Sequence, residues 1–295
     1  PPQRPPQGAD VRGARRQAQA GGAGPGHKLP LPGIRNVVAV ASGKGGVGKS
    51  TVAANLAVAL ARQGHKVGLL DADIYGPSQP RMMGISGRPS TTPDGKRLKP
   101  MESYGVKCMS IGFLVNEETP MIWRGPMVIG ALEQLLRDVE WGPLDLLVVD
   151  MPPGTGDAQL TMAQRVPLAG AIIVSTPQDI ALLDARRGIA MFRKVEVPIL
   201  GLIENMSTFV CPNCGHETHI FAHGGARTDA ERLKVPFLGE VPLAMPIRET
   251  SDAGTPIAGS APDSEPGQAF AAIAGKIWQQ ISAAAPPSSP KIVIE

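Results

Sequence analysis

The glycine-rich segment Ala41–Thr51, which reads ASGKGGVGKST, constrains this chain more than any other feature. The apolar run Asn36–Ser42 leads into it, and the helical pattern Ser50–Arg62 follows it. The spacing G-x-x-x-x-G-K-[ST] is met by Gly43, Gly48, Lys49 and Ser50. A loop of this kind between a strand and a helix wraps backbone N–H groups around phosphates, and the helix N-terminus adds its positive end. The segment predicts a nucleotide-binding loop.

Positions within this loop have distinct predicted tasks. Lys49 is placed to reach the β- and γ-phosphates, and the Ser50 hydroxyl is placed to bind Mg²⁺. Lys44 is a second lysine, which the spacing does not require; it lies among glycines at the mouth of the loop and can project across a nucleotide. We expect ATP to contact Gly43, Lys44, Gly45, Gly46, Val47, Gly48, Lys49, Ser50 and Thr51.

Short apolar runs alternate with helical patterns along most of the chain. Six runs read as strands buried on both faces: Asn36–Ser42, Lys66–Asp71, Val106–Ile111, Leu144–Asp150, Gly170–Thr176 and Pro198–Asn205. Helices are predicted over Ser50–Arg62, Met127–Val139, Asp157–Arg165, Asp179–Val195 and Gly267–Ala283. The alternation predicts an α/β fold with a doubly wound, mostly parallel sheet flanked by helices.

Composition divides the chain into three parts. Residues 1–33 are rich in Pro, Gly, Gln and Arg and lack apolar periodicity, so we expect a disordered basic arm. An Arg-rich, acid-poor start also leaves a transit peptide open. Residues 34–284 form the predicted P-loop domain, with a cysteine-bearing insert at 207–221, and residues 285–295 are an expected flexible tail.

Most of the positive charge lies near the start of the chain. The net charge is +3, yet residues 1–35 hold six Lys or Arg and one Asp, so the remainder is mildly acidic. This argues against a specific nucleic-acid surface, which needs clustered Lys and Arg. No apolar run approaches the ~18 residues of a membrane span. The last predicted helix is flanked by one cation, Lys276, so its stripe should pack on the core: Phe270, Ile273, Ile277, Trp278 and Ile281.

Three aspartates end or follow predicted strands, at the sheet edge where the phosphates should lie. Asp150 ends the run LLVVD, and its carboxylate is placed to hold Mg²⁺ through water, because Mg²⁺ dehydrates reluctantly. Asp71 and Asp73 lie in LLDADIYGPS and alternate along an extended chain, so they need different roles. The stiff turn Pro152–Gly156 is of a kind that switches when a γ-phosphate leaves.

The spacing K-G-G-x-G-K-S of Lys44–Ser50 resembles the deviant Walker A signature of the MinD, ParA, nitrogenase iron protein and Mrp class. The resemblance implies a catalytic Lys44 that reaches the phosphates bound by a partner subunit, as an arginine finger does in trans, and hydrolysis that depends on dimerisation. Lys49 would serve the chain's own nucleotide. The class pattern also implies that Asp73 orients the attacking water and that Asp71 lies nearer the metal.

The cysteines do not form a secreted disulfide framework, because there are three and two of them are close. Cys211 and Cys214 lie in CPNCG, a metal knuckle whose turn puts both sulfurs on one side. Two thiolates are half a ligand set; a symmetric dimer would supply four, for a 4Fe–4S cluster or for Zn²⁺. A dithiol redox centre stays open, as does a Cys₂His₂ zinc site that uses two of His216, His219 and His223.

The order of the motifs resembles the Mrp/ApbC family of iron–sulfur carrier ATPases, which includes the mitochondrial NUBPL. The match covers residues 36 to about 260 and rests on the phosphate loop, DADIYGPS, DMPPGTGD, STPQDIALLDARRG, ENMS and CPNCG. The family implies a weakly hydrolysing homodimer, joined through the nucleotide face and the Cys211/Cys214 knuckle. It would bind ATP, Mg²⁺ and a bridging 4Fe–4S cluster, and pass the cluster to apo iron–sulfur proteins. Asn205 matches the position that hydrogen-bonds adenine.

Two further functions compete with a cluster carrier. A MinD- or ParA-like positioning ATPase with a structural zinc knuckle would need a basic amphipathic C-terminal helix or a basic dimer face. An iron-protein-like reductase would use its cluster for electrons. The expected location is the bacterial cytoplasm, with the mitochondrial matrix as the alternative.

Overall fold

The computed structural model describes residues 28–115 and 125–283. The six predicted strands are present with ends shifted by two residues or fewer: β1 (Ile34–Ala41), β2 (Val67–Asp71), β4 (Val106–Ser110), β5 (Leu144–Asp150), β6 (Gly170–Ser175) and β7 (Ile199–Asn205). Two further strands, β3 (Met101–Ser103) and β10 (Phe237–Val241), were not predicted. β3 has three residues and β10 has five, and neither forms a long apolar run in the sequence. Both strands are only partly buried.

These strands form one eight-stranded sheet in the order β10-β7-β6-β1-β5-β2-β4-β3. Neighbouring strands are parallel except β3 and β4, which pair antiparallel at one edge. The predicted α/β class with a mostly parallel sheet is therefore confirmed. In the register of β2 and β5, Asp71 lies opposite Asp150, so two predicted site residues end adjacent strands.

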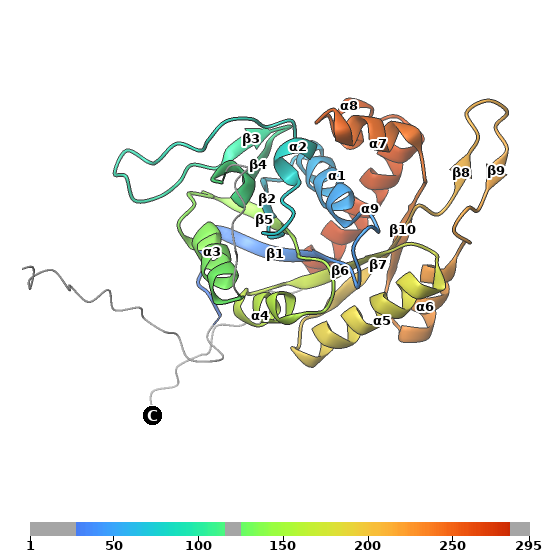
Figure 1. Cartoon of the computed structure of the whole chain (residues 1–295), viewed down its shortest axis with the longest axis horizontal. Helices are drawn as coiled ribbons and strands as arrows, with labels where there is room; N and C mark the ends of the chain where they lie inside the picture. Colours follow the sequence, from blue (N-terminus) through green and yellow to red (C-terminus); the bar gives the residue numbers. More distant parts are fainter. Residues whose placement is uncertain (1–27, 116–124, 284–295) are drawn as a thin grey trace, which may run out of the picture.

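Helices cover both faces of the sheet (Figure 1). One layer contains α1 (Lys49–Arg62), α2 (Gln79–Met82), α7 (Met245–Asp252), α8 (Ile257–Ser260) and α9 (Glu265–Ala283). The other contains α3 (Gly125–Arg137), α4 (Asp157–Arg165), α5 (Asp179–Lys194) and α6 (Gly225–Leu233), and a 3₁₀ turn, η1 (Ile111–Phe113), follows β4. Sequence analysis missed α2 and α8 because they have four residues, and α6 and α7 because they contain few apolar side chains.

The last helix, α9, packs both on α1 and on the edge strand β10. Four of the five residues of the predicted core stripe are buried where α9 packs on α1 and β10: Phe270, Ile273, Ile277 and Ile281. Trp278 is partly buried and stacks on His65, just beyond α1, with ring centroids 3.8 Å apart. None of the described helices combines the length and apolar character needed to cross a bilayer.

The described chain begins inside the predicted arm. Leu29 is buried, and its N–H donates to the carbonyl of Arg165 at 2.8 Å. Leu29 thus packs on the domain, while the boundary of the predicted arm stays a prediction. Residues 1–27 of the arm and the predicted tail at 285–295 lie outside the described residues.

The predicted insert at 207–221 contains a small hairpin of its own. Strands β8 (Phe209–Val210) and β9 (Glu217–Thr218) pair antiparallel, apart from the main sheet. The hairpin projects beyond the helical layers (Figure 1), and the CPNCG turn lies at its end.

Candidate functional site

The glycine-rich loop lies at the carboxyl end of β1, in the middle of the sheet, and leads directly into α1. Gly48 caps α1 with φ at +79°, a left-handed backbone that favours glycine. A Cβ atom on Gly48 would lie 2.2 Å from Asn205 Nδ2, and one on Gly43 would lie 2.1 Å from the backbone of Asp184. These glycines therefore allow neighbouring segments to approach the loop closely.

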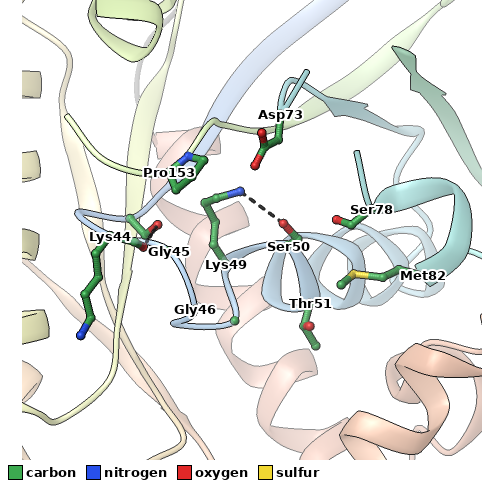
Figure 2. A pocket seen from close by; sticks show the side chains of 12 residues that line it. Lys44, Gly45, Gly46, Lys49, Ser50, Thr51, Asp73, Ser78, Met82 and Pro153 are labelled. Atoms are coloured by element: carbon green, nitrogen blue, oxygen red, sulfur yellow. Dashed lines mark hydrogen bonds between the residues drawn. The ribbon is translucent and has the colours of Figure 1, made fainter. Parts of the chain in front are cut away.

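The loop borders a cavity of about 230 Å³ at the N-terminus of α1 (Figure 2). Of the nine loop residues predicted to contact ATP, all but Gly43 and Val47 line it, together with Ser42, Asp73, Ser78, Met82 and Pro153. Val47 is buried. A helix N-terminus in such a cavity attracts phosphate, because unpaired N–H groups and the helix dipole both favour negative charge.

Lys49 and Asp150 form a buried ion pair beside this cavity. Lys49 Nζ lies 2.5 Å from Asp150 Oδ1 and donates to Ser50 Oγ at 3.2 Å. The side chain of Lys49 is 6% exposed, and that of Asp150 is 0% exposed. Pairing spares each buried group the large penalty of an isolated charge. Lys49 thus rests between the two side chains predicted to hold Mg²⁺.

Ser50 and Asp150 fit a Mg²⁺ site. Hydroxyl and carboxylate oxygens are the ligands that Mg²⁺ prefers. Because Lys49 Nζ contacts both side chains, their oxygens lie within reach of one common point. A cation held there would take the place of the lysine ammonium, which is free to move to a phosphate.

Asp71 lies beneath the loop that follows β2 and has a structural task there. Its carboxylate is fully buried and accepts hydrogen bonds at 3.0–3.2 Å from Ser110 Oγ and from the backbone N–H groups of Asp73, Ser78 and Gln79. Burial, with the charge of Asp150 as the second cause, raises the pKa of Asp71 to about 7. Asp71 therefore shapes the loop 73–79, and its predicted place nearer the metal stays a prediction.

Asp73 lines the cavity, as a residue that orients water must. It is half-buried, and Figure 2 shows its side chain on the same side of the cavity as the Lys49 ammonium. Burial raises its pKa above the ordinary value, against the opposing charge of Lys49. A raised pKa makes a carboxylate a stronger proton acceptor. Its role with the attacking water stays a prediction.

Asn205, at the end of β7, is bound to the loop. Its Nδ2 donates to the carbonyl of Val47 at 2.8 Å. It also lines a second cavity of about 230 Å³, which shares Gly48, Thr51 and Met82 with the first. A base could extend from bound phosphates along this shared wall. Contact of Asn205 with adenine stays a prediction. The opposite wall, 242–252, follows the unpredicted strand β10 and carries no motif that sequence analysis could have found.

Lys44 differs from Lys49 in direction. Figure 2 shows its side chain pointing away from Lys49 and Ser50, although its backbone belongs to the same loop. The direction agrees with a lysine that serves a second subunit. Its reach to a partner's phosphates stays a prediction.

The cysteine pair lies at the end of the β8–β9 hairpin. Cys211 is partly buried, Cys214 is exposed, and both thiols are free. The turn is closed by the N–H of Cys211, which donates to the carbonyl of His216, and by the N–H of Gly215, which donates to the carbonyl of Cys211, both at 2.9 Å. Hydrogen bonds from the backbone N–H groups of Asn213 and Cys214 lower the pKa of Cys211.

The histidines after the cysteines do not join them in the described structure. His219 and His223 pack on one another, with ring centroids 4.4 Å apart. Among described residues, the group of metal-ligating side chains within 4.8 Å of one another is Glu204, His223 and Glu240, without a cysteine. Glu204 caps α6 through the N–H groups of Gly224 and Ala226, and Arg227 pairs with Glu240. This arrangement does not assemble the Cys₂His₂ site.

Comparison with known proteins decides the family. A family described as ParA, NUBPL iron-transfer P-loop NTPase, matches residues 33–278. The chain belongs to this NUBPL family. The resemblance of its motifs to Mrp/ApbC and NUBPL proteins is thereby confirmed.

Two relatives are similar to this chain over most of its length. The iron–sulfur cluster transfer protein NUBPL of Mus musculus is 56% identical over 254 residues, which cover 85% of this chain and 79% of the mouse protein. The iron–sulfur cluster carrier protein of Escherichia coli K12 is 53% identical over 253 residues, which cover 86% of this chain and 68% of that protein.

Solved structures share the fold of this chain. A nucleotide-binding protein from Archaeoglobus fulgidus, in complex with ADP, has a TM-score of 0.68 and 42% identity over 76% of this chain and 88% of that chain. The cell division ATPase MinD of Pyrococcus furiosus has a TM-score of 0.62 and 22% identity, covering 83% of this chain and 99% of its own. The MinD likeness shows a common fold.

Proposed function

We propose that this chain is an iron–sulfur cluster carrier that binds a 4Fe–4S cluster between two copies of itself and passes it to apo iron–sulfur proteins, under the control of ATP. The observation that carries the proposal is the pair of free thiols, partly buried Cys211 and exposed Cys214, on a chain that also has a phosphate-loop cavity. Its relatives at 53–56% identity bear the names of cluster carrier and cluster transfer proteins.

The hairpin has the chemistry that a transferable cluster needs. A 4Fe–4S cluster takes four thiolates, and one chain supplies two. A lowered pKa of Cys211 favours the thiolate, which is the form that binds iron. Val210 and Ile220 flank the pair and are 44% and 52% exposed. Pairing of two hairpins about a twofold axis would complete the ligand set and cover these apolar side chains.

The nucleotide is proposed to be ATP with Mg²⁺. Lys49 would leave Asp150 and bind the phosphates, while Ser50 and Asp150 would hold the metal, which would supply positive charge to neutralise developing phosphate charge. Asp73 orients the attacking water. Lys44 points out of its own cavity and stabilises charge on a nucleotide bound by the partner copy. The proposed activity is therefore a weak ATPase that requires dimerisation.

Partners and location follow from the same proposal. The acceptors are apo iron–sulfur proteins, and no specific nucleic-acid partner is proposed because the charge of the chain beyond its start is mildly acidic. Thiols have to stay reduced to bind a cluster, which favours the bacterial cytoplasm, with the mitochondrial matrix as the alternative.

The competing positioning ATPase has less support. Its membrane-binding version needs an exposed apolar stripe on the C-terminal helix, and in α9 that stripe is buried against α1 and β10.

Anaerobic reconstitution with iron and sulfide tests the proposal. We expect about four irons per dimer, with visible absorption, and loss of both in a Cys211→Ser, Cys214→Ser variant. Cys108→Ala is the matched control, because Cys108 is buried in β4 and should leave iron content unchanged. Iron should then move to an apo-ferredoxin without net oxidation or reduction. A colourless protein that retains zinc would contradict the carrier function.

A further inference from the structure

Gln79 is a fully buried polar residue to which the proposed function gives no role. It is the first residue of α2, and its backbone N–H donates to Asp71 Oδ2 at 3.1 Å. Its side-chain Nε2 donates to Asp150 Oδ2 at 2.9 Å and to the carbonyl of Ser50 at 3.1 Å. One residue therefore connects the loop 73–79 to the ends of β2 and β5 and to the start of α1.

The contact with Asp150 matters most when nucleotide is bound. Within residues 28–115 and 125–283, the side chain of Asp150 has two side-chain partners: Lys49 at Oδ1 and Gln79 at Oδ2. A phosphate-loop lysine serves the phosphates once they arrive, so Lys49 then leaves Asp150. A buried carboxylate needs hydrogen bonds to hold its orientation, and the amide of Gln79 is the donor that remains.

A second observation points to a ligand at the same place. Gln79 Oε1 is buried and has no hydrogen-bond partner within the part of the chain that the structure describes. Buried side-chain oxygens are normally paired. Nε2 of the same amide contacts the carboxylate of Asp150 and the backbone carbonyl of Ser50, so the unpaired acceptor belongs to a side chain held beside two of the predicted Mg²⁺ residues. The waters of a hydrated cation are donors and could satisfy it.

We propose that Gln79 is a positioning residue of the nucleotide site, which holds Asp150 in orientation for Mg²⁺ after Lys49 moves to the phosphates. Through its place at the end of the loop 73–79, it also links the state of Asp150 to Asp73 on the cavity wall. The inference rests on the proposed function, since it requires binding of a Mg²⁺–nucleotide.

The test measures affinity for a fluorescent ADP analogue in EDTA and across a Mg²⁺ titration. Gln79→Met keeps the side-chain length and removes both amide contacts. We expect its half-saturating Mg²⁺ concentration to rise about 10-fold, the scale for loss of a residue that orients a metal ligand. Its affinity in EDTA should stay within about twofold of wild type, which a general loss of structure would not permit.

Gln159→Met is the matched control. Gln159 is 2% exposed and also has an unpaired Oε1, but its Nε2 donates to the carbonyl of Pro152 rather than to Asp150. It should titrate like wild type. If Gln79→Met does not fold, Gln79→Leu replaces it in the same titration.

The proposal fails if the Gln79 variant needs no more Mg²⁺ than wild type, shifts only as much as Gln159→Met, or loses equal affinity in EDTA. These results leave the proposed function standing as long as wild type binds nucleotide more tightly with Mg²⁺. A wild-type protein that binds no nucleotide under either condition refutes the proposed function instead, so the two failures are distinguishable.

Discussion

The nucleotide cavity and the cysteine hairpin are built in opposite ways. The cavity lies at the carboxyl ends of central strands, where Lys49, Asp71 and Asp150 are buried and each makes several polar contacts. The hairpin pairs two residues on each strand and carries exposed Val210 and Cys214. The first is shaped by the core of one chain, whereas the second offers half of a ligand set.

Because of this difference, binding at the cavity and binding at the hairpin should depend on different properties of the protein. Binding at the cavity should follow the stability of the fold, because its walls are ends of core elements. Cargo binding at the hairpin should follow the association of two copies, because each copy brings two thiols. Lys44 is the residue that would break this division, since its proposed role makes hydrolysis at the buried cavity depend on a second copy as well.

We expect Lys44→Ala to bind ATP like wild type but to hydrolyse it about 10³-fold more slowly, the low end for a cation supplied in trans. Lys49→Ala should lose nucleotide affinity itself. Steady-state turnover and equilibrium nucleotide binding measure the two effects. Full turnover by Lys44→Ala would mean that hydrolysis does not need Lys44 from a second copy.

Mixing the two lysine variants tests action across the interface. In a mixed dimer, one copy binds nucleotide through Lys49 and the other contributes Lys44, so turnover should recover. Absence of recovery, with mixed dimers demonstrated by native mass spectrometry, would contradict a role for Lys44 in trans.

Alanine substitution of one glycine in the phosphate loop and one in the hairpin tests how rigid each region is. Gly48 and Gly215 have φ of +79° and +71°, but a Cβ would meet Asn205 at 2.2 Å in the loop and nothing within 4 Å in the hairpin. Gly215→Ala should lower the free energy of unfolding by about 1–2 kcal/mol, the cost of a left-handed backbone. Gly48→Ala should lose at least about twice as much, and its nucleotide affinity. Urea unfolding measures both, and equal losses would mean that the loop adapts as easily as the hairpin.

The raised pKa of Asp71 predicts a pH dependence that belongs to the buried region. The ordinary pKa is 3.8 and the native one is about 7, so between these values the native state holds a proton that the unfolded chain has released. The free energy of unfolding therefore increases as pH falls, by about 1 kcal/mol between pH 7 and pH 6. Urea unfolding of the nucleotide-free protein across pH 5–8 measures this slope. Asp71→Asn should reduce it, and an unchanged slope would assign it to another group.

The smallest effect is expected at the hairpin. Cys211→Ser with Cys214→Ser should change the free energy of unfolding by less than about 0.5 kcal/mol and leave nucleotide affinity unchanged, because the pair supports no core contact. A large loss of stability without iron would show that the hairpin contributes to the fold.

The sequence allowed prediction of those parts of the molecule that are marked by patterns in neighbouring residues. Strands β1, β2 and β5 are apolar runs, and the phosphate loop has a specific spacing between a strand and a helix. Edge strand β10 contains Gly239 and Glu240 and is only partly buried, so its apolar pattern is weak. The hydrogen bonds of Asp71 to its own loop were not predicted, because an alternating Asp pair does not reveal that one carboxylate faces the N–H groups of that loop. Gln79 belongs to no motif, and its contact with Asp150 exists only once the chain has folded.

The stack of Trp278 on His65 gives the protein an optical reporter of its own. α1 begins at the phosphate loop, runs for 14 residues, about 21 Å, and ends three residues before His65. A shift of α1 at its first turn would therefore be expected to alter the surroundings of an indole ring at its far end. Because the chain also contains Trp123 and Trp141, a variant with both replaced would let the emission of Trp278 report on events in the cavity without a chemical label.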